Sequence, residues 1–126
     1  MNKEVNKPEQ VLWLEQQLGF ELEEVKNIEE LKKVERLEPH RRCLLNENKE
    51  IIGLNLFYNE DNISDFSFLS GLKGLTSLDI SFNNISDISF LSGLKGLTSL
   101  HLADNNISDI SFLSGLKGLT SLSLAD

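Results

Sequence analysis

Alternating apolar and polar residues in the second half of the chain predict short β-strands. The stretch 78–81, Leu-Asp-Ile-Ser, has the period of a strand with one buried face. Asn83 and Asn84 follow as turn formers, and from residue 88 to 97 isoleucine or leucine recurs at every third position. This spacing suits a tight 3-10 return, and Gly93 and Gly96 argue against a long α-helix there.

This unit of strand and return repeats with a period of 22 residues. Residues 84–104 and 106–126 differ only at His101 and Ser123, and residues 62–82 are a third, slightly divergent copy. A partial copy precedes them at 51–59. One such unit cannot bury its own leucines, but stacked units bury them in a continuous column. The repeats therefore predict an α/β solenoid over 51–126, of about four turns with the last one incomplete.

Residues 1–50 contain no repeat and are expected to cap the first turn of this solenoid. A helix is predicted to begin after Asn6 and to stop at Gly19, with Val11, Leu14 and Leu18 as its apolar stripe.

The second part of this cap is predicted to contain another helix and a hairpin. The helix starts near Asn27, carries Ile28, Leu31 and Val34, and ends before Pro39. The stretch 43–56, with turn formers at 46–49, then indicates a β-hairpin that leads into the first repeat strand.

The repeat spelling LxxLxLxxNxIxDIxxL resembles the leucine-rich repeat of bacterial internalins over about 76 residues. The resemblance implies a right-handed leucine-rich-repeat solenoid with a parallel β-sheet on its concave face, 3-10 returns on its convex face and a helical N-terminal cap. It also implies a buried ladder of amide side chains that bond the backbone of neighbouring turns, at Asn59, Asn83 and Asn105. The chain departs from the family by placing phenylalanine where many members have proline, at Phe68, Phe90 and Phe112.

The cap is similar to the start of bacterial Roco-family proteins, in the stretches 14–22 (Leu-Glu-Gln-Gln-Leu-Gly-Phe-Glu-Leu) and 51–54 (Ile-Ile-Gly-Leu). In that family leucine-rich repeats precede a GTPase module, so the resemblance implies the front end of a larger signalling protein. A phosphate-binding loop needs Lys and then Ser or Thr after its last Gly, whereas Lys73 precedes Gly74 here. We therefore expect no GTPase activity in this chain.

The composition narrows the class of protein. The net charge of −8 disfavours nucleic acid as a partner, because the chain repels phosphates. A single cysteine excludes an internal disulfide framework and fits a reducing compartment. The sequence shows no signal peptide and no apolar stretch long enough to cross a membrane. We expect a cytoplasmic bacterial domain with no nucleic-acid or membrane partner.

Candidate catalytic and metal-binding residues are few. His40 and His101 lack further ligands at metal spacing, and Cys43 lacks a positioned base. Asp65, Asp87 and Asp109 recur every 22 residues and either attract a cation or, as we favour, each close their own turn by bonding local amides. We expect no enzyme, no metal and no cofactor.

The differences between the copies gather in and just after the strands, at residues 79–82 and at His101 against Ser123. Most of these positions point away from the core or stand at the strand's exit. They are explained either by drift of residues that pack on nothing or by contacts to a protein or peptide partner. The aromatic side chains among them favour partner binding, because exposed aromatic clusters are typical of binding surfaces. The candidate partner-binding residues are Asn55, Phe57, Tyr58, Asp79, Ser81, Phe82, His101, Ala103, Asp104 and Ser123.

The incomplete last turn supports a second hypothesis. Its apolar side chains are expected to line an open end of the solenoid, so that the chain is either part of a longer array or stacks on another molecule there. A two-fold end-to-end dimer closes itself, whereas head-to-tail stacking makes fibres. The candidate self-association residues are Ile110, Leu113, Leu116, Leu119, Leu122 and Leu124.

Overall fold

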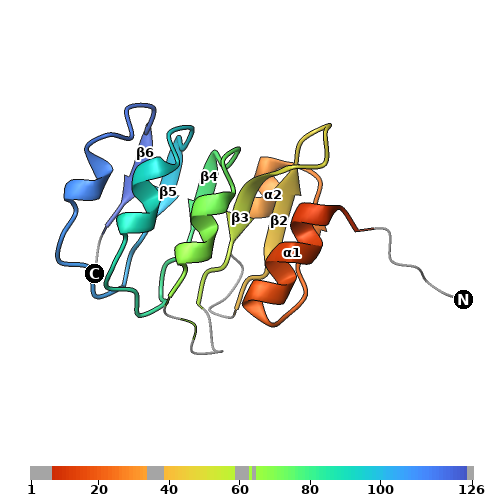
Figure 1. The fold of residues 1–126 in the computed structure, drawn as a ribbon, viewed down its shortest axis with the longest axis horizontal. Helices are drawn as coiled ribbons and strands as arrows, with labels where there is room; N and C mark the ends of the chain where they lie inside the picture. The colour runs from red at the N-terminus through yellow and green to blue at the C-terminus, as the bar shows by residue number, and fades with distance from the viewer. Residues whose placement is uncertain (1–6, 34–38, 59–62, 64, 125–126) are drawn as a thin grey trace, which may run out of the picture.

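The computed structural model describes residues 7–33, 39–58, 63 and 65–124 (Figure 1). Its elements combine an N-terminal cap with three turns that each hold a strand and a 3-10 helix. In chain order they are α1 (Glu9–Leu18), β1 (Glu23–Val25), α2 (Ile28–Lys32), β2 (Arg42–Leu45), β3 (Ile51–Asn55), η1 (Ser67–Gly71), β4 (Ser77–Asp79), η2 (Ser89–Gly93), β5 (Ser99–His101), η3 (Ser111–Leu113) and β6 (Ser121–Ser123).

Within the described residues, all the strands join one six-stranded sheet in the order β1-β2-β3-β4-β5-β6. The strands from β3 to β6 are parallel and keep the register of the sequence repeat, so that Leu54, Leu78, Leu100 and Leu122 share one row. Three of these leucines are buried on the same face of the sheet. The predicted solenoid with a parallel sheet is confirmed.

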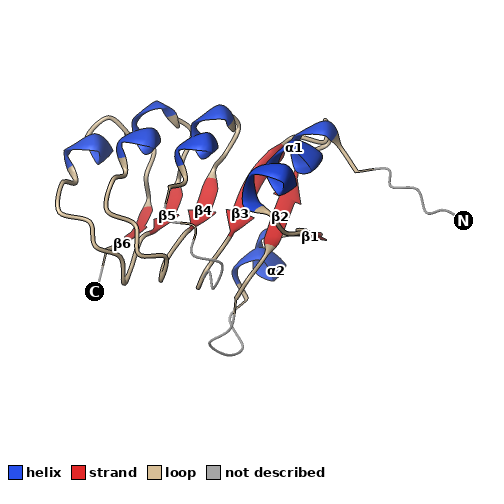
Figure 2. Ribbon diagram, turned by 60° about the horizontal axis from the view of Figure 1, so that its bottom comes forward, coloured by secondary structure: helices blue, strands red, loops and turns tan. Residues whose placement is uncertain are grey.

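The 3-10 helices η1, η2 and η3 line one face of this sheet, and α1 lies on the same side (Figure 2). Between them and the sheet, Val11, Leu14 and Leu18 of α1 join the leucines of the repeats in one buried cluster. The predicted 3-10 returns and the capping role of the first helix are thereby confirmed. We call the opposite face of the sheet the concave face.

The cap follows the predicted pattern at α1 and at the hairpin. The predicted helix start at Asn6 lies outside the described residues, and α1 follows Pro8 and stops at Gly19, whose φ of 86° is left-handed. Strands β2 and β3 pair antiparallel, with an irregularity between Leu44 and Leu45. Strand β1 was not predicted, and it pairs parallel with β2.

Helix α2 is shorter than predicted and lies on the concave face (Figure 2). The side chain of Asn27 caps it as expected by accepting the N–H of Glu30 at 2.9 Å. Only Leu31 is buried, whereas Ile28 is exposed, and the predicted member Val34 lies outside the described residues. A five-residue helix turns too little to bury a longer stripe.

Helix α2 fits its place because the strand beneath it has no side chain at residue 53. A Cβ atom on Gly53 would stand 2.6 Å from Cδ2 of Leu31 and 3.2 Å from Cβ of Leu44, so any larger residue forces these packed side chains to shift. The guanidinium of Arg42 donates to the carbonyls of Glu30 and Leu31 at 3.2 and 3.3 Å, which satisfies backbone groups near the end of α2.

Among the described residues, the structure has no helix that is both long and apolar enough to cross a membrane.

Candidate functional site

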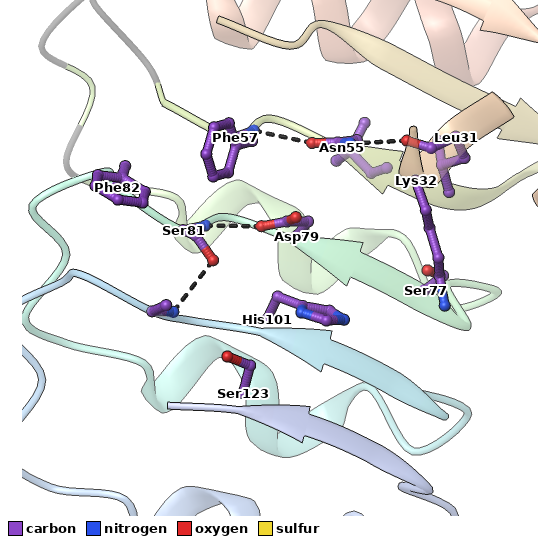
Figure 3. Close-up of a pocket in the computed structure, with 12 residues that line it drawn as sticks. Leu31, Lys32, Asn55, Phe57, Ser77, Asp79, Ser81, Phe82, His101 and Ser123 are labelled. Carbon is purple, nitrogen blue, oxygen red and sulfur yellow. Dashed lines mark hydrogen bonds between the residues drawn. The ribbon is translucent and has the colours of Figure 1, made fainter. Parts of the chain in front are cut away.

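A hollow of about 290 Å³ lies on the concave face, beside α2 and over the strands β3 to β6 (Figure 3). We call it the concave groove. Its lining comes from the cap helix and from four successive strands with the residues that follow them: Leu31, Lys32, Leu54, Asn55, Phe57, Ser77, Asp79, Ser81, Phe82, His101, Ala103 and Ser123.

An aromatic cluster bounds the groove where the strands end. The ring centroids of Phe57 and Phe82 are 5.2 Å apart at an interplanar angle of 68°, an edge-to-face contact. Tyr58 stands beside the groove, with its ring 6.3 Å from that of Phe82. Phe82 keeps 36% of its surface exposed, so this wall offers an apolar surface to an occupant.

Two of these aromatic residues occupy strained backbone positions. Tyr58 and Phe82 both have φ of 60°, in the left-handed region that favours Gly, Asn and Asp. The equivalent residue of the next turn, Asp104, has φ of 57°, is exposed and is not among the residues that line the groove. An aromatic side chain costs about 1 kcal/mol or more at such a position. The backbone geometry thus gives no reason for aromatic residues here.

A polar row crosses the middle of the groove. Asp79, His101 and Ser123 stand opposite one another on β4, β5 and β6, and all three are half-buried. Oδ1 of Asp79 accepts the N–H of Ser81 at 3.0 Å. No hydrogen bond between described residues joins Asp79 to His101 or His101 to Ser123, so the row lacks the linked geometry of a catalytic triad.

Small side chains form the floor next to this row. Ser81 is buried, and its Oγ accepts the N–H of Ala103 at 3.1 Å. Ser81 was predicted as a partner contact; its buried position instead makes it part of the floor, with Ala103 half-buried beside it. The floor is low because neither side chain rises far above the sheet.

Asn55 corrects the predicted binding surface. Its side chain is 2% exposed because α2 covers it. Its Nδ2 donates to the carbonyl of Leu31 at 2.7 Å, and its Oδ1 accepts the N–H of Phe57 at 3.0 Å. The amide therefore holds α2 on the sheet and is not available to a partner.

Four lining residues were not predicted from the sequence: Leu31, Lys32, Ser77 and Leu54, which belongs to the buried leucine row. Ser77 had a usable signal, since it has the same alternation as Asp79 and faces the same side of β4. Leu31 and Lys32 had none, because nothing in the local pattern of α2 indicates which face of the sheet the helix covers.

The recurring aspartates close their own turns, as favoured from the sequence. Oδ1 of Asp65, Asp87 and Asp109 accepts the N–H two residues on, at 3.0, 2.9 and 3.0 Å. These local hydrogen bonds from the following serine lower the pKa of each carboxyl group. In the described part of the chain, no three His, Cys, Asp or Glu side chains are grouped so that they could hold a metal ion.

The remaining candidate nucleophile and the other histidine are packed in the cap. Cys43 is fully buried, and desolvation raises the pKa of its thiol to about 12, so the reactive thiolate is disfavoured. His40 is also buried, with its ring centroid 5.0 Å from that of Phe57. Both side chains are packed inside the protein.

The predicted amide ladder is present in the described turns. Nδ2 of Asn83 donates to the carbonyl of Leu56 at 3.0 Å, and Nδ2 of Asn105 donates to the carbonyl of Ile80 at 3.0 Å. Each amide thus bonds the backbone of the preceding turn. Asn59, the first predicted member, lies outside the described residues.

The last described turn exposes part of the predicted self-association surface. Ile110 and Leu122 keep 52% and 46% of their surfaces exposed. Leu116 is 4% exposed and belongs to the buried core cluster, so its predicted place on this surface is wrong. The other predicted members are partly buried against the same core: Leu113, Leu119 and Leu124.

Stacked parallel strands, 3-10 returns and an amide ladder define the fold as a leucine-rich-repeat solenoid of the internalin type. A family model described as Leucine Rich repeats (2 copies) matches residues 95–126. The chain is thus supported as an internalin-like leucine-rich-repeat protein by its family match and by its similarity to solved structures.

Two similar solved structures are internalins of Listeria monocytogenes str. 4b F2365. Internalin C2 is 31% identical with a TM-score of 0.55, over 66% of this chain and 38% of that one. The internalin inlF is 32% identical with a TM-score of 0.55, over 65% of this chain and 25% of that one. This chain therefore spans well under two thirds of either relative. No curated protein matches its sequence.

Proposed function

We propose that the chain is a non-catalytic interaction module that binds a protein or peptide partner in the concave groove. Leucine-rich repeats and internalin-like relatives support protein interaction in general. The placement of the partner in the groove is our inference from the side chains that line it.

The observation that carries this proposal is the aromatic cluster at the end of the strands. Tyr58 and Phe82 occupy left-handed positions that disfavour them, and the ring of Phe82 stays partly exposed beside the hollow. Drift of unconstrained residues does not favour such a costly arrangement. A partner side chain that covers these rings gives them a role, since aromatic residues are enriched at the centres of interfaces.

The size of the surface favours a peptide segment. Four parallel strands spaced about 4.8 Å apart give a sheet about 15 Å across between its outer strands. A stable interface between globular proteins buries roughly 800 Å² on each partner. The groove therefore suits an extended segment, or one part of a larger contact surface.

The test uses the chain as bait for a random heptapeptide display library, followed by binding assays with the selected peptides. Phe82→Asn removes the aromatic ring and suits the left-handed backbone, so it leaves the fold intact. Leu122→Asp, at the exposed end, is the control. We expect loss of peptide binding with the first variant only. Loss with the second variant alone contradicts binding in the groove.

A second candidate function is self-association through the last turn, in a dimer or a stack. The observation that favours it is the exposure of two large apolar side chains, Ile110 and Leu122, in the last described turn. Sedimentation velocity over a range of concentrations tests it: association that Leu122→Asp abolishes supports this function. A constant monomer mass at high concentration refutes it.

We also propose that the chain works in the cytoplasm as the N-terminal part of a larger signalling protein, as the similarity of its cap to Roco-family proteins suggests. A GTPase motif encoded in the same reading frame supports this assignment, and an export signal in that frame contradicts it.

A further inference from the structure

Two opposite charges lie at fixed places in the concave groove. We infer that the groove binds an extended segment of a partner protein in which an acidic, a basic and an apolar side chain follow one another at alternate positions. This inference rests on the proposed function, since it requires a partner in the groove.

The positive charge comes from Lys32 in the last turn of α2. Three contacts fix the helix that carries it: Asn55 bonds the carbonyl of Leu31, Arg42 bonds carbonyls near the end of the helix, and Leu31 packs over Gly53. Figure 3 shows the Lys32 side chain extending from α2 toward Ser77. The cap thus contributes a charged group to a surface otherwise made by the repeats.

The negative charge comes from Asp79, at the end of β4. Its carboxylate is half-buried, and one oxygen accepts the N–H of Ser81. Neither Lys32 nor Asp79 takes part in a salt bridge among the described residues, where Lys7 pairs with Glu15. Each charge is therefore available to an oppositely charged group of an occupant, and such charge-assisted hydrogen bonds are stronger than neutral ones.

The apolar subsite lies at the other end of the groove. The rings of Phe57 and Phe82 form its wall, and the small side chains of Ser81 and Ala103 form its floor. A side chain of the partner enters this space without displacing a large residue of the groove. It covers the exposed part of Phe82, which favours an aliphatic or aromatic side chain there.

The spacing of the subsites matches an extended chain. Ser77 and Asp79 of β4 and Ser81, two residues beyond the strand, all line the groove at alternate positions, which places the three subsites about 6.6 Å apart along the strand direction. Side chains on one face of an extended segment have the same spacing. An occupant that runs along β4 therefore presents its acidic group to Lys32, its basic group to Asp79 and its apolar group to Phe82.

Charge reversal tests this inference with peptides from the heptapeptide library. The variants are Lys32→Glu, Asp79→Lys and the double variant that exchanges both charges. Lys95→Glu and Glu47→Lys, at exposed positions outside the groove lining, are the matched controls. Circular dichroism and the urea midpoint establish that each variant is folded.

We expect the unmodified chain to select peptides with acidic, basic and apolar residues at alternate positions. Each single reversal lowers the affinity for these peptides by about tenfold, and the double variant selects peptides with the two charges exchanged. The controls change the affinity by less than about twofold.

The outcomes separate this inference from the proposed function. Suppose that peptide binding requires Phe82, but that both charge-reversed variants bind the same peptides with the same affinity and select peptides of the same composition. This result overturns the inference and leaves the proposed function standing. Failure to select any peptide whose binding depends on Phe82 overturns the proposed function, and the inference with it.

Discussion

Replacement of Asn105 by alanine is expected to destabilise the solenoid far more than replacement of its neighbour Asn106. Oδ1 of Asn105 accepts the N–H groups of Asn83 and Ile85 at 2.9 and 2.8 Å. Its Nδ2 donates to the carbonyl of Ile80 in the preceding turn at 3.0 Å. Alanine leaves these backbone groups without their partner inside the stack, where water reaches them poorly.

The expected loss follows from these contacts. A buried N–H left without a partner costs about 1–3 kcal/mol. Asn83 and Ile85 are both buried, whereas Asn105 itself is half-buried, so water replaces part of what is lost. We expect the free energy of unfolding to fall by about 3 kcal/mol. Asn106 is exposed and bonds the side chain of Asn84, so its replacement costs about 0.5 kcal/mol or less.

Urea unfolding at 25 °C and pH 7, followed by circular dichroism, measures both losses. With a slope of about 2 kcal/mol per molar urea, the midpoint of Asn105→Ala falls by about 1.5 M. The midpoint of Asn106→Ala stays within about 0.3 M of the unmodified chain. A difference between the two variants below about 1 kcal/mol refutes the argument that this amide holds adjacent turns together.

Further predictions concern the cap and the turns. Gly53→Ala lowers the urea midpoint and weakens peptide binding, because the added Cβ meets the Leu31 side chain. Gly74→Ala is the control and does neither, because the atom nearest to its added Cβ is 3.7 Å away. The pKa of the Cys43 thiol is raised to about 12, so we expect it to react with Ellman's reagent only when the chain unfolds. The unfolded chain loses this proton at a lower pH than the native chain does, so the free energy of unfolding falls as pH rises above about 8.5. Reaction of the folded chain at the rate of a free thiol contradicts this. The lowered pKa of Asp87 means that its contribution to stability is present above the unfolded pKa and is lost as pH falls through the folded one. Asp87→Asn keeps the acceptor oxygen but cannot be protonated in this range, so the melting temperature of this variant falls less between pH 7 and pH 3 than that of the unmodified chain. An equal fall in both proteins contradicts a role of the Asp87 carboxylate in stability.

The repeated half of the protein was predictable because its structure is set by neighbours in sequence. Residues 78 to 81 alternate in polarity, and Leu91 and Leu94 recur at every third position, so strand and return follow from local pattern. Each turn packs on an almost identical turn, and the period of 22 residues therefore fixes the register between strands as well. The outward positions of Asp79 and His101 follow from the same alternation, whereas Phe82 comes after the strand at a left-handed position that breaks it.

The cap was predictable only in part, because its parts are placed by contacts between residues distant in sequence. The caps at Asn27 and Gly19 are local signals, and both were found. Strand β1 forms through its pairing with β2, and the length of α2 depends on what lies beneath it. Neither leaves a pattern in its own segment that decides between strand, helix and loop.

The concave groove shows the same division. The sequence by itself determined the solenoid, the row of polar side chains and the aromatic positions at the ends of the strands. Only the tertiary structure decided that α2 covers Asn55, that Lys32 enters the groove and that Leu116 is buried. The hydrogen bond that seats α2 joins residues 24 positions apart, Asn55 and Leu31, over a glycine that leaves room for the helix. Such a fit depends on the shapes of two surfaces, and periodicity along the chain does not encode it.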